Sequence, residues 1–132
     1  MATLVAVDQA HSFVLNVRSA EAGAVNPRWV RCEVSVLGGA AAGTQRVSLT
    51  ESDVEELIAG FTASPPVSLG FRGTDENLIV VLEPADRIGT FFFSTWIGEP
   101  YVLMTGWRFP VTAADVSAFG MALRREFGVM AS

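Results

Sequence analysis

Residues 87–127 carry the densest apolar and aromatic content of the chain and constrain its fold more than any other stretch. Two apolar segments, 89–97 and 101–109, flank a Gly-Glu-Pro reversal at 98–100. Strand-forming runs on either side of turn residues are typical of a β-hairpin. Large side chains occupy both faces of both segments, which favours a hairpin packed on two sides. Apolar residues then recur at helical spacing over 112–127, so the hairpin is expected to lead into an amphipathic helix.

Two helices are expected, and both begin with the pattern Thr-x-x-Asp. In the first helix, 50–61, Thr50 is placed as the N-cap and Asp53 stands at the capping-box position. Its apolar stripe consists of Val54, Leu57, Ile58 and Phe61. The second helix, 112–127, is expected to bury Val116, Phe119, Leu123 and Phe127.

The other apolar segments indicate strands joined by short turns, and they lie at 3–7, 12–18, 29–37, 44–49, 67–71 and 78–82. Several of them alternate apolar and polar residues, the period of a half-buried strand. The segment 78–82 is instead continuously apolar, which favours a central strand covered on both faces. Together these segments predict an α+β domain with a largely antiparallel, curved sheet of six to eight strands and two amphipathic helices.

An internal repeat is a further expectation. Residues 46–61 and 108–123 align without a gap at an offset of 62 residues, from an Arg on a strand into Thr-x-x-Asp-Val. The chain is therefore expected to form a single domain over 1–132, with 1–64 and 65–132 as two β-meander-plus-helix units. The alternative is coincidence, because Thr-x-x-Asp is a good helix start in any protein.

Charge and composition limit the classes of partner. The net charge is −5, with 14 acidic against 9 basic residues, which disfavours a nucleic-acid binder. No window reaches the roughly 18 consecutive apolar residues of a membrane helix, and the first residues lack the features of a secretory signal. A cytoplasmic protein is expected, without a membrane or nucleic-acid partner.

Catalytic and metal-binding patterns are weak in this sequence. His11 is the only histidine, and the adjacent Ser12 is expected on the opposite face of its strand. Cys32 shares an apolar strand face with Val30 and Val34, which favours a buried structural thiol. The carboxylate pairs available for acid–base chemistry lie in expected turns, at Asp75/Glu76, Glu83/Asp86 and Glu99. We therefore expect no enzyme activity, no cofactor and no metal site.

Two surfaces are candidates for binding. The outward face of the strand 29–37 presents Trp29, Arg31 and Glu33, and Trp and Arg are frequent hot-spot residues. The first helix begins with the acidic residues Glu51, Glu55 and Glu56, which also suit the helix dipole. An alternative is a small-ligand pocket lined by the aromatic cluster of residues 91–109, although core packing explains that cluster more simply.

The two strand-to-helix junctions, LTESDVEELIAGF (49–61) and WRFPVTAADVSAFGMALRREF (107–127), resemble those of the WapI-type immunity proteins of bacterial polymorphic toxin systems. The resemblance extends to the strand-rich order, with one helix in mid-chain and one at the C-terminal end. It implies a small cytosolic protein that binds a cognate toxin domain and blocks it without chemistry of its own. The net charge of −5 favours a basic toxin domain as that partner. It carries no functional residues over to this sequence.

Overall fold

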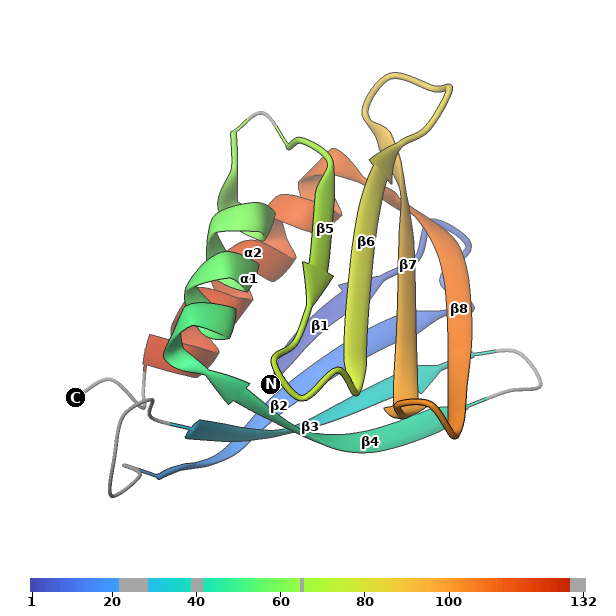
Figure 1. The fold of residues 1–132 in the computed structure, drawn as a ribbon. Coiled ribbons are helices and arrows are strands. Elements are labelled where there is room, and N and C mark those ends of the chain that lie inside the picture. Colours follow the sequence, from blue (N-terminus) through green and yellow to red (C-terminus); the bar gives the residue numbers. More distant parts are fainter. Residues whose placement is uncertain (22–28, 39–41, 65, 129–132) are drawn as a thin grey trace.

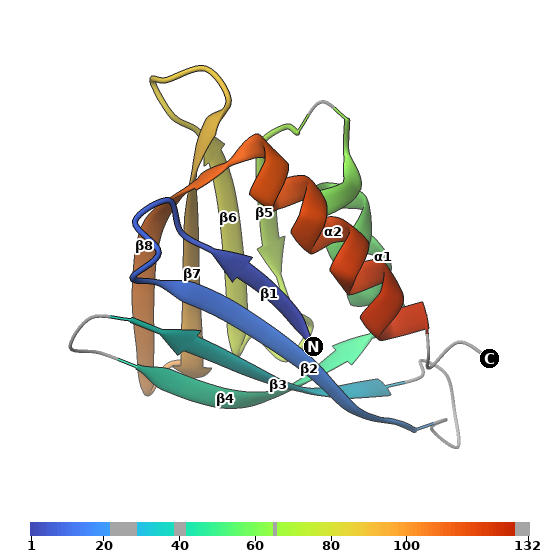
Figure 2. The same cartoon turned by 180° about the vertical axis from the view of Figure 1, so that it is seen from behind.

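A computed structural model describes residues 1–21, 29–38, 42–64 and 66–128 of the chain. They form two four-stranded antiparallel sheets and two helices (Figures 1 and 2). Sheet A consists of β1 (Ala2–Val5), β2 (Ser12–Glu21), β3 (Trp29–Leu37) and β4 (Gly43–Thr50), followed by α1 (Glu51–Thr62). Sheet B consists of β5 (Leu69–Arg72), β6 (Leu78–Pro84), β7 (Thr90–Glu99) and β8 (Leu103–Thr112), followed by α2 (Ala113–Gly128). The expected α+β class is confirmed, and each half of the chain has the same order of elements.

The strands form two sheets, where a single curved sheet was expected. Within each half, every strand pairs with its neighbour in sequence. The helix α1 separates β4 from β5, so no hairpin joins the two meanders. Alternation of apolar residues specifies which face of a strand is buried but does not say which edges pair. The strand expected at 12–18 is longer in the structure, where β2 continues to Glu21.

The two sheets and both helices bury one shared core. Each sheet turns one face inward, and the helices close the side of the molecule next to β1 and β5 (Figures 1 and 2). Phenylalanine rings from both sheets and both helices meet at its centre with centroids 4.9–6.3 Å apart. These rings belong to Phe13, Phe61, Phe93, Phe109 and Phe119. Aromatic contacts at this spacing add to the hydrophobic gain from burying the rings.

Both helices begin at the Thr-x-x-Asp motifs, as expected. The hydroxyl of Thr50 accepts a hydrogen bond from the amide of Asp53, and the Asp53 carboxylate accepts one from the amide of Thr50. The hydroxyl of Thr112 accepts a similar bond from the amide of Asp115 at the start of α2. The expected apolar stripe of α2 is buried in full, and its members are Val116, Phe119, Leu123 and Phe127. In α1, Leu57 and Phe61 are buried.

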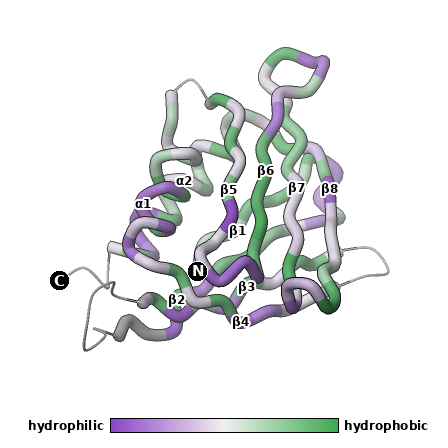
Figure 3. Tube along the Cα trace, in the orientation of Figure 1, coloured by the Kyte–Doolittle hydropathy of each residue, from purple (hydrophilic) through white to green (hydrophobic). Residues whose placement is uncertain are grey.

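The expectation that β6 and the β7–β8 hairpin are covered on both faces is wrong. Along β6, Leu78, Val80 and Leu82 are buried, whereas Ile79 and Val81 on the other face are only partly buried. Figure 3 shows β6 hydrophobic over most of its length, and in Figure 1 no described helix lies in front of the outer face of sheet B. The continuous apolar run of β6 therefore belongs to a strand that is covered by the core on one face only.

No helix within the described residues is both long enough and apolar enough to cross a membrane.

Candidate functional site

A shallow hollow surrounds Trp29 at the place where β3 and β4 meet the β5–β6 turn. Its volume is about 240 Å³, and it is lined by Trp29, Arg31, Ser48 and Asp75. Trp29 is half-buried and Arg31 is exposed on the outer face of sheet A. Trp29 lies opposite Thr50, the residue that starts α1. The hollow thus combines an aromatic surface with one cation and one anion.

Side-chain hydrogen bonds between the two halves hold this hollow in shape. Asp53 accepts bonds from the amide and the hydroxyl of Thr74 in the β5–β6 turn, at 3.1 and 3.0 Å. The amide group of Asn77 donates to the backbone oxygen of Arg46 on β4, at 3.3 Å. Because Asp53 is buried, its bonds are shielded from water and strengthen accordingly. They hold the β5–β6 turn so that Asp75 lines the same hollow as Trp29, although the two residues are far apart in sequence.

The outer face of sheet A is locally basic, although the chain as a whole is acidic. Arg31, Glu33 and Arg46 lie on this face, with Glu33 directly opposite Arg46 in the strand register. A guanidinium nitrogen of Arg18 donates to a carboxylate oxygen of Glu33 at 3.0 Å. A hollow of about 510 Å³ runs between these side chains. Sequence analysis predicted Arg31 and Glu33 here but missed Arg18 and Arg46, whose strands were not known to lie beside β3.

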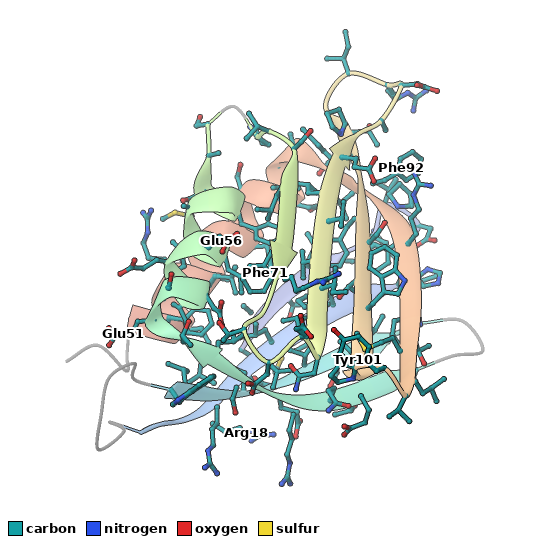
Figure 4. The ribbon with its side chains drawn as sticks, in the orientation of Figure 1. Arg18, Glu51, Glu56, Phe71, Phe92 and Tyr101 are labelled. Carbon is teal, nitrogen blue, oxygen red and sulfur yellow. The ribbon has the colours of Figure 1, made fainter. Side chains whose placement is uncertain are left out.

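The three predicted acidic residues form a separate, adjoining surface. Glu51, Glu55 and Glu56 are exposed on α1, and Figure 4 shows Glu51 at the start of that helix. Asp53, the fourth acidic residue at the start of α1, is buried, and its carboxylate accepts hydrogen bonds from the amides of Thr50 and Thr74. The predicted site residues therefore fall into two groups that adjoin where Trp29 pairs with Thr50. We call the Trp29 hollow, its flanking charges and the three acids of α1 the Trp29 surface.

The only histidine has an acidic neighbour. Nδ1 of His11 lies 3.2 Å from a carboxylate oxygen of Asp8, and its ring stacks on Phe109 with centroids 5.7 Å apart. The amide of Ala10 donates to Asp8 at 2.8 Å, and this bond, with the contact to His11, holds the pKa of Asp8 below its usual value. No described hydroxyl or thiol is hydrogen-bonded to His11, so the pair lacks a nucleophile in its described surroundings.

The other candidate groups do not converge on one another. Glu76 accepts a bond from the hydroxyl of Tyr101 at 3.2 Å. Burial, and secondarily the carboxylate of Glu126, raises the pKa of the Cys32 thiol to about 12, so it stays protonated at neutral pH. In the described ranges, no three His, Cys, Asp or Glu side chains are grouped to hold a metal ion.

The aromatic cluster of residues 91–109 does not line one common pocket. Phe91, Phe93 and Phe109 are buried in the core, and Tyr101 at the tip of the β7–β8 hairpin is 94% exposed. Phe92 and Trp96 lie on the outer face of sheet B, on β7, which pairs with β6 on one side and β8 on the other. A hollow of about 480 Å³ beside Trp96 is lined by Glu83, Ser94, Trp96, Gly106, Trp107 and Arg108.

Comparisons with known proteins relate this chain to a known fold. No protein-family model matches the sequence, and no curated protein matches it significantly. Among solved structures, the plant transcriptional regulator PBF-2 is similar, with a TM-score of 0.51 and 20% sequence identity. The similarity covers 91% of this chain and 79% of that chain. At this level of identity the likeness concerns the arrangement of sheets and helices alone.

Proposed function

We propose that this protein is a non-catalytic binding domain, an immunity protein that binds and blocks a cognate toxin in the bacterial cytoplasm. The observation that carries the proposal is the Trp29 hollow, which a half-buried tryptophan lines together with Arg31, Ser48 and Asp75. A tryptophan and an arginine beside a shallow depression are the features of an interface hot spot. The domain needs no cofactor for this role.

The residues around the hollow support two different roles in binding, in which acidic residues steer the partner and other residues anchor it. The exposed acids Glu51, Glu55 and Glu56 lie on α1, where they attract a basic partner from a distance. Exposed ion pairs contribute only about 0–1 kcal/mol each, so these residues steer association more than they hold the complex. Trp29 and Arg31 would supply the anchoring contacts. The rest of the basic outer face of sheet A, which carries Arg18 and Arg46, disfavours the same partner and so favours docking on the side of Trp29 that faces α1.

Association kinetics test the steering role of the acidic residues of α1. The probe is the product of the neighbouring gene, immobilised for binding measurements at several salt concentrations. Replacing Glu51, Glu55 and Glu56 by Gln should slow association and flatten its salt dependence, with little change in dissociation. The matched control replaces the exposed acids Asp8, Asp86 and Glu99 by Asn or Gln, the same change in net charge away from α1. Equal effects in both variants would contradict a steering role for α1.

The anchoring role has its own control. Trp29→Ala should speed dissociation, whereas Trp96→Ala, which removes a tryptophan from the other sheet, should leave toxin dissociation unchanged. If neither substitution changes dissociation of a complex that does form, the partner binds elsewhere on the protein.

A small-ligand-binding module is a second candidate, favoured by the 480 Å³ hollow beside Trp96. Its volume falls in the range of ligand sites, about 300–1,000 Å³. Quenching of tryptophan fluorescence by members of a metabolite library, lost in Trp96→Phe, would support it. The structural likeness to PBF-2 concerns the fold and supports no proposal about transcription.

A further inference from the structure

The two sheets can be compared position by position, because each is a four-stranded meander that leads into a helix at a Thr-x-x-Asp sequence. Aligning Thr50 with Thr112 matches the outer face of β4 with that of β8. The cross-strand pairs then match as well. Arg31–Ser48, Glu33–Arg46 and Ser35–Thr44 in sheet A correspond to Phe92–Pro110, Ser94–Arg108 and Trp96–Gly106 in sheet B.

This comparison reveals a difference in chemistry between equivalent surfaces. Phe92 and Trp96 of sheet B stand where sheet A has Arg31 and Ser35. The next strand shows the same trend, since Val81 stands where sheet A has Asn16. At these three positions sheet A keeps its fold with Arg31, Ser35 and Asn16, so the fold does not require apolar residues there. At the position of Ile79, sheet A also has an apolar residue, Val14. We call the outer residues of sheet B, Ile79, Val81, Glu83, Phe92, Ser94, Trp96, Gly106 and Arg108, the sheet B face.

The aromatic side chains of this face pack against neighbouring residues of β8. A Cβ atom added to Gly106 would lie 2.4 Å from Nε1 of Trp96, so the indole rests directly over that glycine. The guanidinium of Arg108 lies 4.2 Å from the centroid of the Phe92 ring. Trp96 nevertheless remains 37% exposed. Partly exposed aromatic and branched side chains around a shallow hollow, with no described helix or strand covering them, are features of a protein interface.

We propose that the sheet B face binds the same face of a second copy of this chain. The charges on the face are self-complementary. Glu83 and Arg108 border the same hollow, and within the described residues neither has an ion-pair partner of opposite charge. A two-fold interface repeats each contact, so Glu83 of one copy can meet Arg108 of the other twice. A basic toxin, in contrast, suits the acids of α1 better than a face whose two charged residues, Glu83 and Arg108, balance each other.

The size of the face sets the expected affinity. Strands about 4.8 Å apart make a four-stranded face roughly 15–20 Å wide. Such a face can bury only a small interface, and interfaces below about 1,200 Å² in total are usually transient. We therefore expect a dimer with a dissociation constant on the order of 1–100 μM. This inference does not depend on the proposed toxin, because the experiment uses the protein alone.

Sedimentation velocity between about 1 μM and 1 mM tests the inference directly. The average mass of the parent should rise from 14.1 kDa towards twice that value as concentration increases. The variant Trp96→Ser with Gly106→Thr copies the Ser35–Thr44 pair of sheet A, whose hydroxyls lie 3.2 Å apart, and so keeps a native-like surface. It should weaken dimerisation at least about tenfold. Arg46→Glu, at the sheet A position equivalent to Arg108, is the control and should dimerise like the parent.

Charge reversal supplies a second test that does not disturb the aromatic residues. Glu83→Arg alone should weaken the dimer, and so should Arg108→Glu alone. The double variant should restore it, because the two charges then attract again across the interface. Circular dichroism of each variant confirms that it is folded.

Three outcomes would overturn the inference. The parent could remain at 14.1 kDa at every concentration. It could dimerise equally well after Trp96→Ser with Gly106→Thr. The third outcome is a monomeric parent whose sheet B variants lose binding to the neighbouring gene product, which would assign the face to the toxin.

Discussion

Gly120 of α2 lies directly against the backbone of Phe61 in α1, so that a Cβ atom at Gly120 would stand 2.3 Å from the Phe61 carbonyl oxygen. The two helices cross at this point, and the side chains of Phe61 and Phe119 meet beside it with centroids 4.9 Å apart. Only glycine permits this close approach. The contact fixes the position of α2 over the core.

The substitution Gly120→Ala should therefore destabilise the protein. Alanine favours the helical backbone by about 1 kcal/mol relative to glycine. The clash with a backbone oxygen opposes this gain, since overpacking typically costs about 1–3 kcal/mol or more. Urea unfolding should show a net loss of about 1–2 kcal/mol. Gly128→Ala in the same helix is the control, because no atom of the described residues outside its own helical turn lies within 4 Å of the new Cβ, and it should change stability by less than about 1 kcal/mol.

The two Thr-x-x-Asp motifs should differ in their contribution to stability. Asp53 caps α1 and also binds Thr74, whereas Asp115 binds only Thr112 among the described side chains. Asp53→Ala should cost about 2–4 kcal/mol, because it removes a cap and leaves a partly buried amide without a partner. Asp115→Ala should cost about 0.5–1 kcal/mol. Equal losses in thermal or urea unfolding would show that the Asp53–Thr74 connection contributes little.

The docking of α2 depends on its buried stripe. Leu123 is 1% exposed, and Leu123→Ala should lower the free energy of unfolding by about 2–5 kcal/mol. Met121, two residues earlier, is largely exposed, so Met121→Ala should change it by less than about 0.5 kcal/mol. A Leu123→Ala variant that melts like the parent would mean that α2 is not docked on the core.

Cys32 should be unreactive until the protein unfolds. With a pKa of about 12, its thiolate fraction at pH 8 is on the order of one in ten thousand. A disulfide reagent such as DTNB should label the denatured protein rapidly. It should label the native protein only at the rate at which the structure around Cys32 opens. The thiol ionises near pH 9 when unfolded and only near pH 12 when folded, so stability should fall as the pH rises above about 9. Fast labelling of the native protein would contradict the burial of Cys32.

Local patterns predicted the elements of this fold well. The bounds of β3 follow from alternation, and the start of α1 follows from Thr50 and Asp53 because capping is a short-range interaction. Both helical stripes were predicted from spacing alone. The division into two sheets was not predicted, because the pairing of strand edges depends on contacts between residues far apart in sequence. The bonds from Asp53 to Thr74 were missed for the same reason.

The surfaces were harder to predict than the elements. Trp29, Arg31 and Glu33 were placed together because they alternate along one strand. Arg18 and Asp75 could not be assigned to the same surface without knowledge of the tertiary contacts. The apolar residues on both faces of β6 and β7 predicted two-sided packing, since hydrophobicity does not distinguish a face covered by the same chain from one left for a partner.

Growth rescue tests the central claim most directly. The product of the neighbouring gene is expressed in a bacterial host alone, with this protein, and with its Trp29→Ala, Arg31→Ala double variant. The proposed function predicts that the neighbour is toxic alone, that the parent restores growth, and that the double variant, folded and expressed at the same level, restores it poorly. A harmless neighbour, or a toxic one that this protein neither binds nor neutralises, would contradict the claim.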